Sequence, residues 1–136
     1  GTLWALGNGD NARTITAYDH ASRQFAYPGV LGSNPDGDAH RNPTVLVDDR
    51  GFITVFYGAH GHATHVVRSE RPYEISAWRQ MPDMPEPRTT YPQPWLISPG
   101  EAMVSYRHAP GWNFVSTRDG GETLSLIHIS EPTRPY

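Results

Sequence analysis

The chain has 136 residues, a formal net charge of −3 and no cysteine. The small negative charge excludes the basic footprint of a nucleic-acid-binding surface. The lack of cysteine excludes disulfide bonds and thiolate metal sites, and no apolar stretch is long enough to span a bilayer. A chain of this length has room for one small domain.

Strand-length apolar runs separated by turn residues occur along the chain, whereas helical periodicity is hard to find. Residues 3–6 and 14–18 are the first expected strands, with a turn between them at 7–10, and a loop is expected at 32–38. The next expected strands are residues 44–47, 52–57, 64–69, a weak one near Trp78, 95–97, 102–106 and 113–117. Five prolines predict an extended loop over residues 79–94.

Residues 42–69 and 91–118 align with each other without a gap, and residues 1–6 resemble residues 51–56 as a third copy truncated at its front. Matching positions are Pro43 and Pro92, Gly51 and Gly100, and Tyr57 and Tyr106. A repeat of about 40–50 residues made of short strands is typical of β-propeller blades. We therefore expect an all-β fragment of a propeller, about two and a half blades, over residues 1–123.

The last residues depart from this repeat. Residues 116–123 read as an Asp-box turn, after which a tryptophan should pack into the blade, but Leu124 follows instead. Residues 124–136 look like the translation of a sequencing adapter, so we expect a non-native tail there and assign no role to His128. The alternative is a genuine strand over residues 124–129.

Four chemically active side chains are expected on one face of the propeller. Strands of a blade alternate in direction, so the loop entering the first strand and the loop between the second and third strands open on the same face. His40 and Tyr91 lie before first strands, and His60 and Arg107 lie after second strands. Two neighbouring blades would thus present all four side chains around one cleft.

These residue types suit β-elimination from a uronic acid polymer. An arginine that binds the carboxylate makes the proton on the adjacent carbon more acidic, and histidine or tyrosine can remove that proton or protonate the leaving oxygen. A glycosidase needs two carboxyl groups, and this face has no convincing pair. Asp36 and Asp38 lie near the face in a loop and stay unassigned.

His60 and two further histidines raise the question of a metal. His60, His62 and His65 are close in sequence, and imidazoles can share zinc. His62 and His65 alternate poorly with a strand, and no acidic ligand or cysteine is near them in sequence. We therefore expect no metal site and no cofactor in this chain. His108 follows Arg107 directly and is a candidate substrate contact, as is Asn42.

Several segments resemble a known family. They are residues 38–44 (Asp-Ala-His-Arg-Asn-Pro-Thr), 47–53, 56–60, 68–78 and 90–94. They resemble BNR-repeat-containing propeller proteins and, within that group, the seven-bladed polysaccharide lyases of the ulvan-lyase type. The resemblance implies that His40, His60, Tyr91 and Arg107 carry the elimination. It departs after His40, where Arg41-Asn42 stands in place of the Asn-Thr that those lyases tend to have.

Together these inferences predict part of an exported bacterial lyase, periplasmic or secreted, that acts on an acidic polysaccharide and binds neither nucleic acid nor membrane. Arg107 would neutralise the uronate carboxylate, and His40 and Tyr91 would share the base and acid roles in an order left open. A structural metal elsewhere in the family's propeller stays open as well. The alternatives are a sialidase-like glycoside hydrolase and a non-catalytic carbohydrate-binding propeller.

Overall fold

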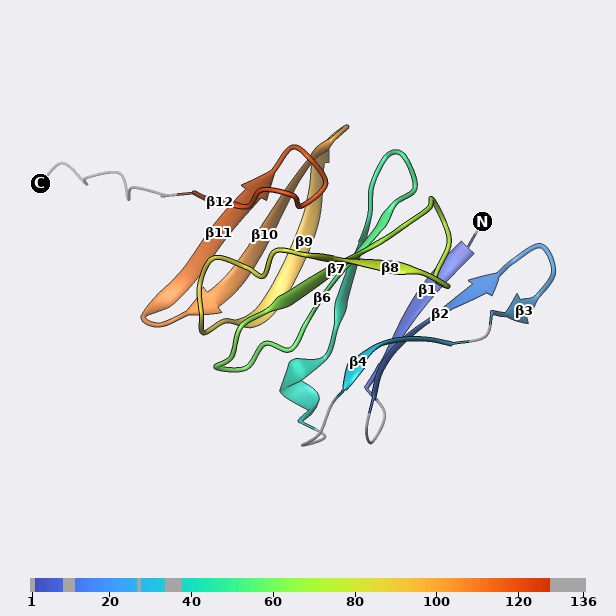
Figure 1. The fold of residues 1–136 in the computed structure, drawn as a ribbon, viewed down its shortest axis with the longest axis horizontal. Helices are drawn as coiled ribbons and strands as arrows, with labels where there is room; N and C mark the ends of the chain where they lie inside the picture. The colour runs from blue at the N-terminus through green and yellow to red at the C-terminus, as the bar shows by residue number, and fades with distance from the viewer. Residues whose placement is uncertain (1, 9–11, 27, 34–37, 128–136) are drawn as a thin grey trace, which may run out of the picture.

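The computed structural model describes residues 2–8, 12–26, 28–33 and 38–127, and it consists of three antiparallel sheets that follow one another across the molecule (Figure 1). Each sheet has four strands. The one helical element in the described part is a single 3-10 turn, η1 (Ala39–Arg41), and no described helix could cross a membrane. The all-β expectation is therefore confirmed.

The first sheet contains the early strands of the chain. Its members are β1 (Thr2–Asn8), β2 (Ala12–Asp19), β3 (Gln24–Phe25) and β4 (Gly29–Ser33). The strands β1 and β2 form the expected hairpin, and β2 also pairs with β3 and β4. The short strands β3 and β4 were not expected from the sequence, because their residues lack a run of alternating apolar side chains.

The second and third sheets are the two copies of the repeat. The second contains β5 (Thr44–Val47), β6 (Ile53–Tyr57), β7 (His65–Ser69) and β8 (Trp78–Met81) in chain order. The third contains β9 (Thr90–Ser98), β10 (Glu101–His108), β11 (Gly111–Thr117) and β12 (Ser125–Ile127), also in chain order. Consecutive antiparallel strands make each sheet a meander, as in a propeller blade.

The core explains why β6 is buried along its whole length. Successive side chains of a strand point to opposite faces of the sheet. Ile53, Val55 and Tyr57 pack with Ile15 and Leu31 of the first sheet. Their neighbour on the other face, Phe56, belongs to the cluster that includes Val104, Tyr106 and Val115 of the third sheet. Because the second sheet lies between two others, both of its faces must be apolar.

The repeat also predicts the turns at one end of the sheets. Gly51 and Gly100, which occupy equivalent positions, have φ values of 85° and 77°, a left-handed conformation that glycine adopts without steric cost. The two turns touch, since the backbone N–H of Gly100 donates to Asp49 Oδ1 at 2.9 Å. The sequence identity between the copies therefore reflects a shared turn geometry and a contact between blades.

The expected loop over residues 79–94 is wrong at both of its ends. Trp78–Met81 forms β8, and Thr90–Ser98 forms β9, so Pro92 and Pro94 lie inside a strand. Proline has no N–H and is tolerated only at a sheet edge. The strand β9 is such an edge strand because β10 is its single partner in the described sheet.

The structure describes the start of the expected tail. Ser125–Ile127 pairs with β11, and Leu124 packs against the cluster that contains Val104 and Tyr106. A strand thus lies within the alternative range of 124–129. The adapter origin of residues 124–136 concerns the source of the sequence and stays a prediction. His128 lies outside the described residues, as does Asp36.

Candidate functional site

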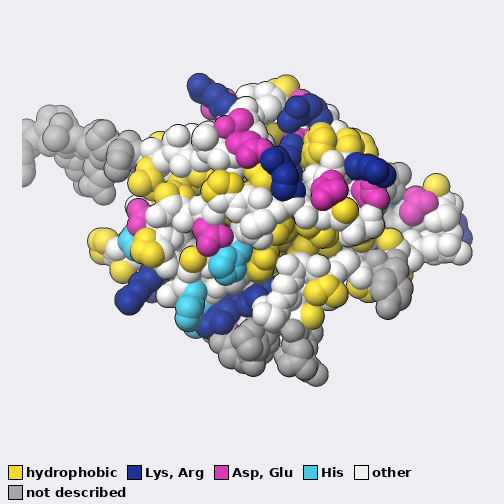
Figure 2. All heavy atoms as spheres, viewed as in Figure 1, with side chains coloured by type: hydrophobic (Ala, Val, Ile, Leu, Met, Phe, Trp, Pro, Cys, Tyr) yellow, Lys and Arg dark blue, Asp and Glu magenta, His cyan; other side chains and the backbone are white. Residues whose placement is uncertain are grey.

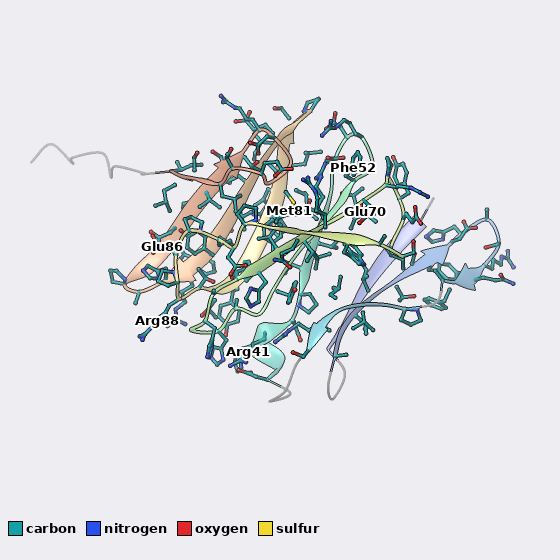
Figure 3. The ribbon with its side chains drawn as sticks, viewed as in Figure 1. Arg41, Phe52, Glu70, Met81, Glu86 and Arg88 are labelled. Atoms are coloured by element: carbon teal, nitrogen blue, oxygen red, sulfur yellow. The ribbon has the colours of Figure 1, made fainter. Side chains whose placement is uncertain are left out.

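The second and third sheets bring four predicted site residues to one end of the molecule. His40 lies in η1, directly before β5, and His60 follows β6. Tyr91 is the second residue of β9, and Arg107 is the penultimate residue of β10. In Figure 3 this end carries the labels Arg41 and Arg88, whereas Phe52 lies at the opposite end with the turns. Figure 2 shows histidine and arginine side chains gathered along the same edge.

A cavity of about 350 Å³ is lined by three of these side chains. They are His60, Tyr91 and Arg107, and His108 lines the cavity with them. His40 joins the group through its ring, which stacks on His60 with centroids 4.4 Å apart and planes inclined by 23°. The His40 ring also lies 6.2 Å from the ring of Tyr91. The four residues therefore form one cluster, and their catalytic roles stay a prediction.

Asn42 does not share this cavity. Its side chain is exposed, and it is not among the residues that line the space beside His60 and Arg107. A role for Asn42 in sugar binding stays a prediction. His108 is held in place by two neighbours: its Nδ1 donates to the carbonyl oxygen of Arg88 at 2.6 Å, and its Nε2 lies 3.4 Å from Glu86 Oε2.

The electrostatics of the cavity favour an anion. Arg88 and Arg107 both line it, and no ion pair joins either guanidinium to a carboxylate among the described residues. No aspartate or glutamate of the described part lines the cavity either. Arg88 was not singled out from the sequence, because it lies in the segment expected to be a proline-rich loop. Its position next to Thr90 and Tyr91, at the entry to a first strand, is the signal that could have found it.

Asp38, which the sequence analysis left unassigned, also belongs to the site. Its Oδ1 accepts hydrogen bonds from the His40 backbone N–H at 2.9 Å and from His40 Nδ1 at 2.8 Å, and its Oδ2 accepts one from His60 Nδ1. The bond from the His40 backbone, followed by those from the two rings, holds the pKa of Asp38 well below its usual range. An aspartate two residues before a candidate histidine forms a local turn, and this spacing could have identified it.

Two site residues have strained backbones. His60 has φ 96° and Tyr91 has φ 55°, in a region that bulky residues rarely adopt and that costs about 1–3 kcal/mol. The buried Thr89 holds this region together, because its carbonyl accepts hydrogen bonds from His60 N–H at 2.8 Å and Gly61 N–H at 3.0 Å. Its own N–H donates to the His62 carbonyl at 3.0 Å. One threonine thus joins the loop of the second sheet to the entry of the third.

The candidate cation ligands in the structure are not the three histidines His60, His62 and His65 that the sequence suggested for zinc. Donor atoms of Asp38, His40 and His60 lie within 4.8 Å of one another, and these are the described residues that could hold a cation. No acidic residue is near His62 or His65 in sequence, and the inference that none would be near them in space is wrong for His65, because Asp83 contacts it. The fold likewise brings Asp38 to His60. His65 lines a separate cavity of about 600 Å³ with Asp83 and Tyr57.

Comparison with known proteins shows which family and which solved fold the chain resembles. The profile of the BNR repeat-containing family matches residues 5–117. The chain is 28% identical to an ulvan lyase of Alteromonas sp. (strain LOR) and 32% identical to an ulvan lyase of Pseudoalteromonas sp. (strain PLSV), over 82% of this chain and 28% of each relative. A solved structure of a polysaccharide lyase described as a PL25 ulvan lyase superimposes with a TM-score of 0.83 at 27% identity, over 98% of this chain and 37% of that one.

Proposed function

Because the chain belongs to the BNR repeat-containing family, whose profile matches residues 5–117, we propose that it contributes the catalytic face of a polysaccharide lyase. The chain spans 28% of the length of the ulvan lyases that it matches, so the activity proposed is that of the full-length gene product. The substrate proposed is an acidic, uronate-containing polysaccharide such as ulvan. Because a polymer of this kind is extracellular, we propose that the protein is periplasmic or secreted.

The observation that carries the proposal is the convergence of Arg107, Tyr91 and His60 at one cavity, with His40 stacked on the ring of His60. Arg107 would bind the uronate carboxylate and stabilise the negative charge that develops when the proton on the adjacent carbon leaves. Arg88 would add a second positive charge on the same wall. Both arginines line the cavity, and no described carboxylate forms an ion pair with either of them.

The proton transfers fall to His40 and Tyr91. One removes the proton from the carbon next to the carboxylate, and the electron pair forms a carbon–carbon double bond as the glycosidic carbon–oxygen bond breaks. The other donates a proton to the leaving oxygen, so no water is consumed. The ring contact between His40 and Tyr91 supports a shared task. His60, stacked on His40 and lining the cavity, would orient the base and the sugar.

The test is a digestion of ulvan and other uronate polymers by the full-length gene product. A lyase produces one unsaturated uronate end for each bond that it cleaves, and these ends absorb in the ultraviolet. New reducing ends without that absorbance would indicate a glycoside hydrolase, and polymer binding without new ends would indicate a binding propeller. Either result would overturn the proposal.

A further inference from the structure

The Asp38 carboxylate contacts both imidazoles of the site. Each of its oxygens accepts from a different ring, Oδ1 from His40 Nδ1 at 2.8 Å and Oδ2 from His60 Nδ1. Its side chain is 23% exposed, against 54% for His40 and 44% for His60, so it is the most buried of the three. This arrangement is unlike a surface ion pair, because a single carboxylate bridges two stacked rings.

The chemistry of the contacts determines where the ring protons lie. An ionised carboxylate can only accept hydrogen bonds, so the nitrogen that faces it must carry the hydrogen. Both rings therefore carry a proton on Nδ1, and Nε2 of each neutral ring has a free lone pair. An imidazole can act as a base only through such a lone pair.

We propose that Asp38 is a positioning residue that fixes both His40 and His60 in the Nδ1–H form and holds their rings in the stack. This inference rests on the proposed lyase function for its kinetic consequence but not for the state of the rings. Asp38 does not reach the substrate in this account. It acts on the reaction through the two histidines.

Neighbouring groups hold the Asp38 carboxylate in position. The His40 backbone N–H donates to Oδ1 at 2.9 Å, and the Arg41 backbone N–H donates to the Asp38 carbonyl at 3.1 Å, which together form η1. Arg41 Nε lies 3.9 Å from Oδ2, and Arg41 Nη2 lies 3.2 Å from His62 Nδ1. A backbone turn and a cation thus hold the carboxylate where the two rings need it.

The chain offers a matched control in Asp83. Its Oδ1 accepts from His65 Nδ1 at 2.9 Å, in a pair with exposures of 43% and 46%. Asp83 and His65 line the other cavity, away from Tyr91 and Arg107. The substitutions Asp38→Asn and Asp83→Asn therefore remove the same charge from the same kind of contact, at the site and away from it.

The first measurement is kinetic, on ulvan with the full-length gene product. An asparagine can accept from one ring only and presents N–H groups to the other, so Asp38→Asn should lower kcat by at least about tenfold with KM changed less than about threefold. Asp38→Glu restores the carboxylate and should recover part of the loss. Asp83→Asn should stay within about twofold of the unmodified protein.

The second measurement reads the rings directly. Long-range ¹H–¹⁵N spectra of histidine-labelled protein distinguish Nδ1–H from Nε2–H forms, with assignments from His40→Gln and His60→Gln. The expected result is Nδ1–H for both rings, lost from at least one of them in Asp38→Asn. Nε2–H rings in the unmodified protein would overturn the proposal even if Asp38→Asn fails to fold.

Two further outcomes count against it. Asp38→Asn activity within about twofold of the unmodified protein would overturn it. So would Zn²⁺-dependent activity together with a Zn²⁺-dependent shift of the His40 and His60 ring ¹⁵N signals, since the cluster would then be a metal site. If the unmodified protein cleaves no uronate polymer, the lyase function fails, while the spectra still decide the role of Asp38.

Discussion

The second and third sheets are built alike at the end that carries the turns and differ at the end that carries the cavity. At the turn end, Gly51 and Gly100 share a left-handed conformation, and the two turns are joined by a hydrogen bond to Asp49. At the cavity end, Gly58 of the second sheet corresponds to Arg107 of the third. Positions that agree between the copies serve packing and chain reversal, and positions that disagree supply the side chains of the candidate site.

If this contrast is right, substitutions at the turn end should change stability with little effect on catalysis. The largest stability effect is expected for Asp48, whose carboxylate pairs with the buried Arg68 and also accepts from the Phe52 N–H at 2.9 Å. Asp48→Ala leaves a buried guanidinium uncompensated, which should lower the free energy of unfolding by about 3–5 kcal/mol. Chemical denaturation of the full-length gene product would measure it.

The control for Asp48 is an exposed ion pair at the same end. Glu101→Ala breaks the pair with Arg118, whose side chain is 82% exposed. Exposed pairs contribute about 0–1 kcal/mol, so the loss should be small. Equal losses for Asp48→Ala and Glu101→Ala would contradict the distinction between a buried pair and a solvated one.

The largest catalytic effect is expected for Arg107. Arg107→Ala removes the charge proposed to stabilise the developing anion and should lower kcat by about 10²–10³-fold, with the fold unchanged. Arg118→Ala removes the same charge at the turn end and should leave kcat unchanged. Steady-state rates of unsaturated-end formation on ulvan test both, and equal losses would remove Arg107 from the site.

Tyr91 has a close match at the turn end in Tyr73. Both are exposed, and both have left-handed backbones, with φ values of 55° and 58°. Tyr91→Phe removes only the hydroxyl and should lower kcat by about 10²-fold if that hydroxyl transfers a proton. Tyr73→Phe should have no effect on kcat. A Tyr91→Phe enzyme with full activity would leave the acid and base roles to the histidines alone.

The smallest predicted effect concerns pH and the turn after β11. Desolvation raises the pKa of Asp119, but hydrogen bonds from Thr123 and Thr117 outweigh it and lower the pKa to about 2. A folded-state pKa below the unfolded value of about 3.9 contributes stability above about pH 4, which is lost as the pH falls toward 2. Asp119→Asn should therefore destabilise at pH 7 and converge with the unmodified protein near pH 2. Thermal unfolding between pH 7 and pH 2 measures the difference, and a constant gap would contradict it.

Much of the scaffold could be predicted because it follows from short patterns. Alternating apolar residues predicted β2, β5, β6, β7, β10 and β11, and the glycines of the copies predicted the turns at Gly51 and Gly100. The expected strand over residues 95–97 lies within β9, but Pro92 and Pro94 hid the beginning of β9, because a proline breaks a central strand but not an edge strand. Edge position depends on pairing, which a local pattern does not report.

The candidate site was also predicted in part, and the remaining features depend on tertiary contacts. Strand direction alone placed His40, His60, Tyr91 and Arg107 at one end, and the structure gathers them there. The spacing of Asp38 and His40 could have indicated their local turn, but the contact of Asp38 with His60 could not be predicted, because it joins two loops that are far apart in sequence. The strain at His60 and Tyr91, and the role of Thr89 in holding both loops, likewise depend on tertiary contacts.

The most direct test of the central claim is the structure of the new chain ends that the full-length gene product makes from ulvan. Proton NMR of the products should show one olefinic signal, from the carbon–carbon double bond, for every new reducing end. This result would mean that elimination accounts for all cleavage. Reducing ends without an olefinic signal would contradict the account, because the bond would then have been broken by water.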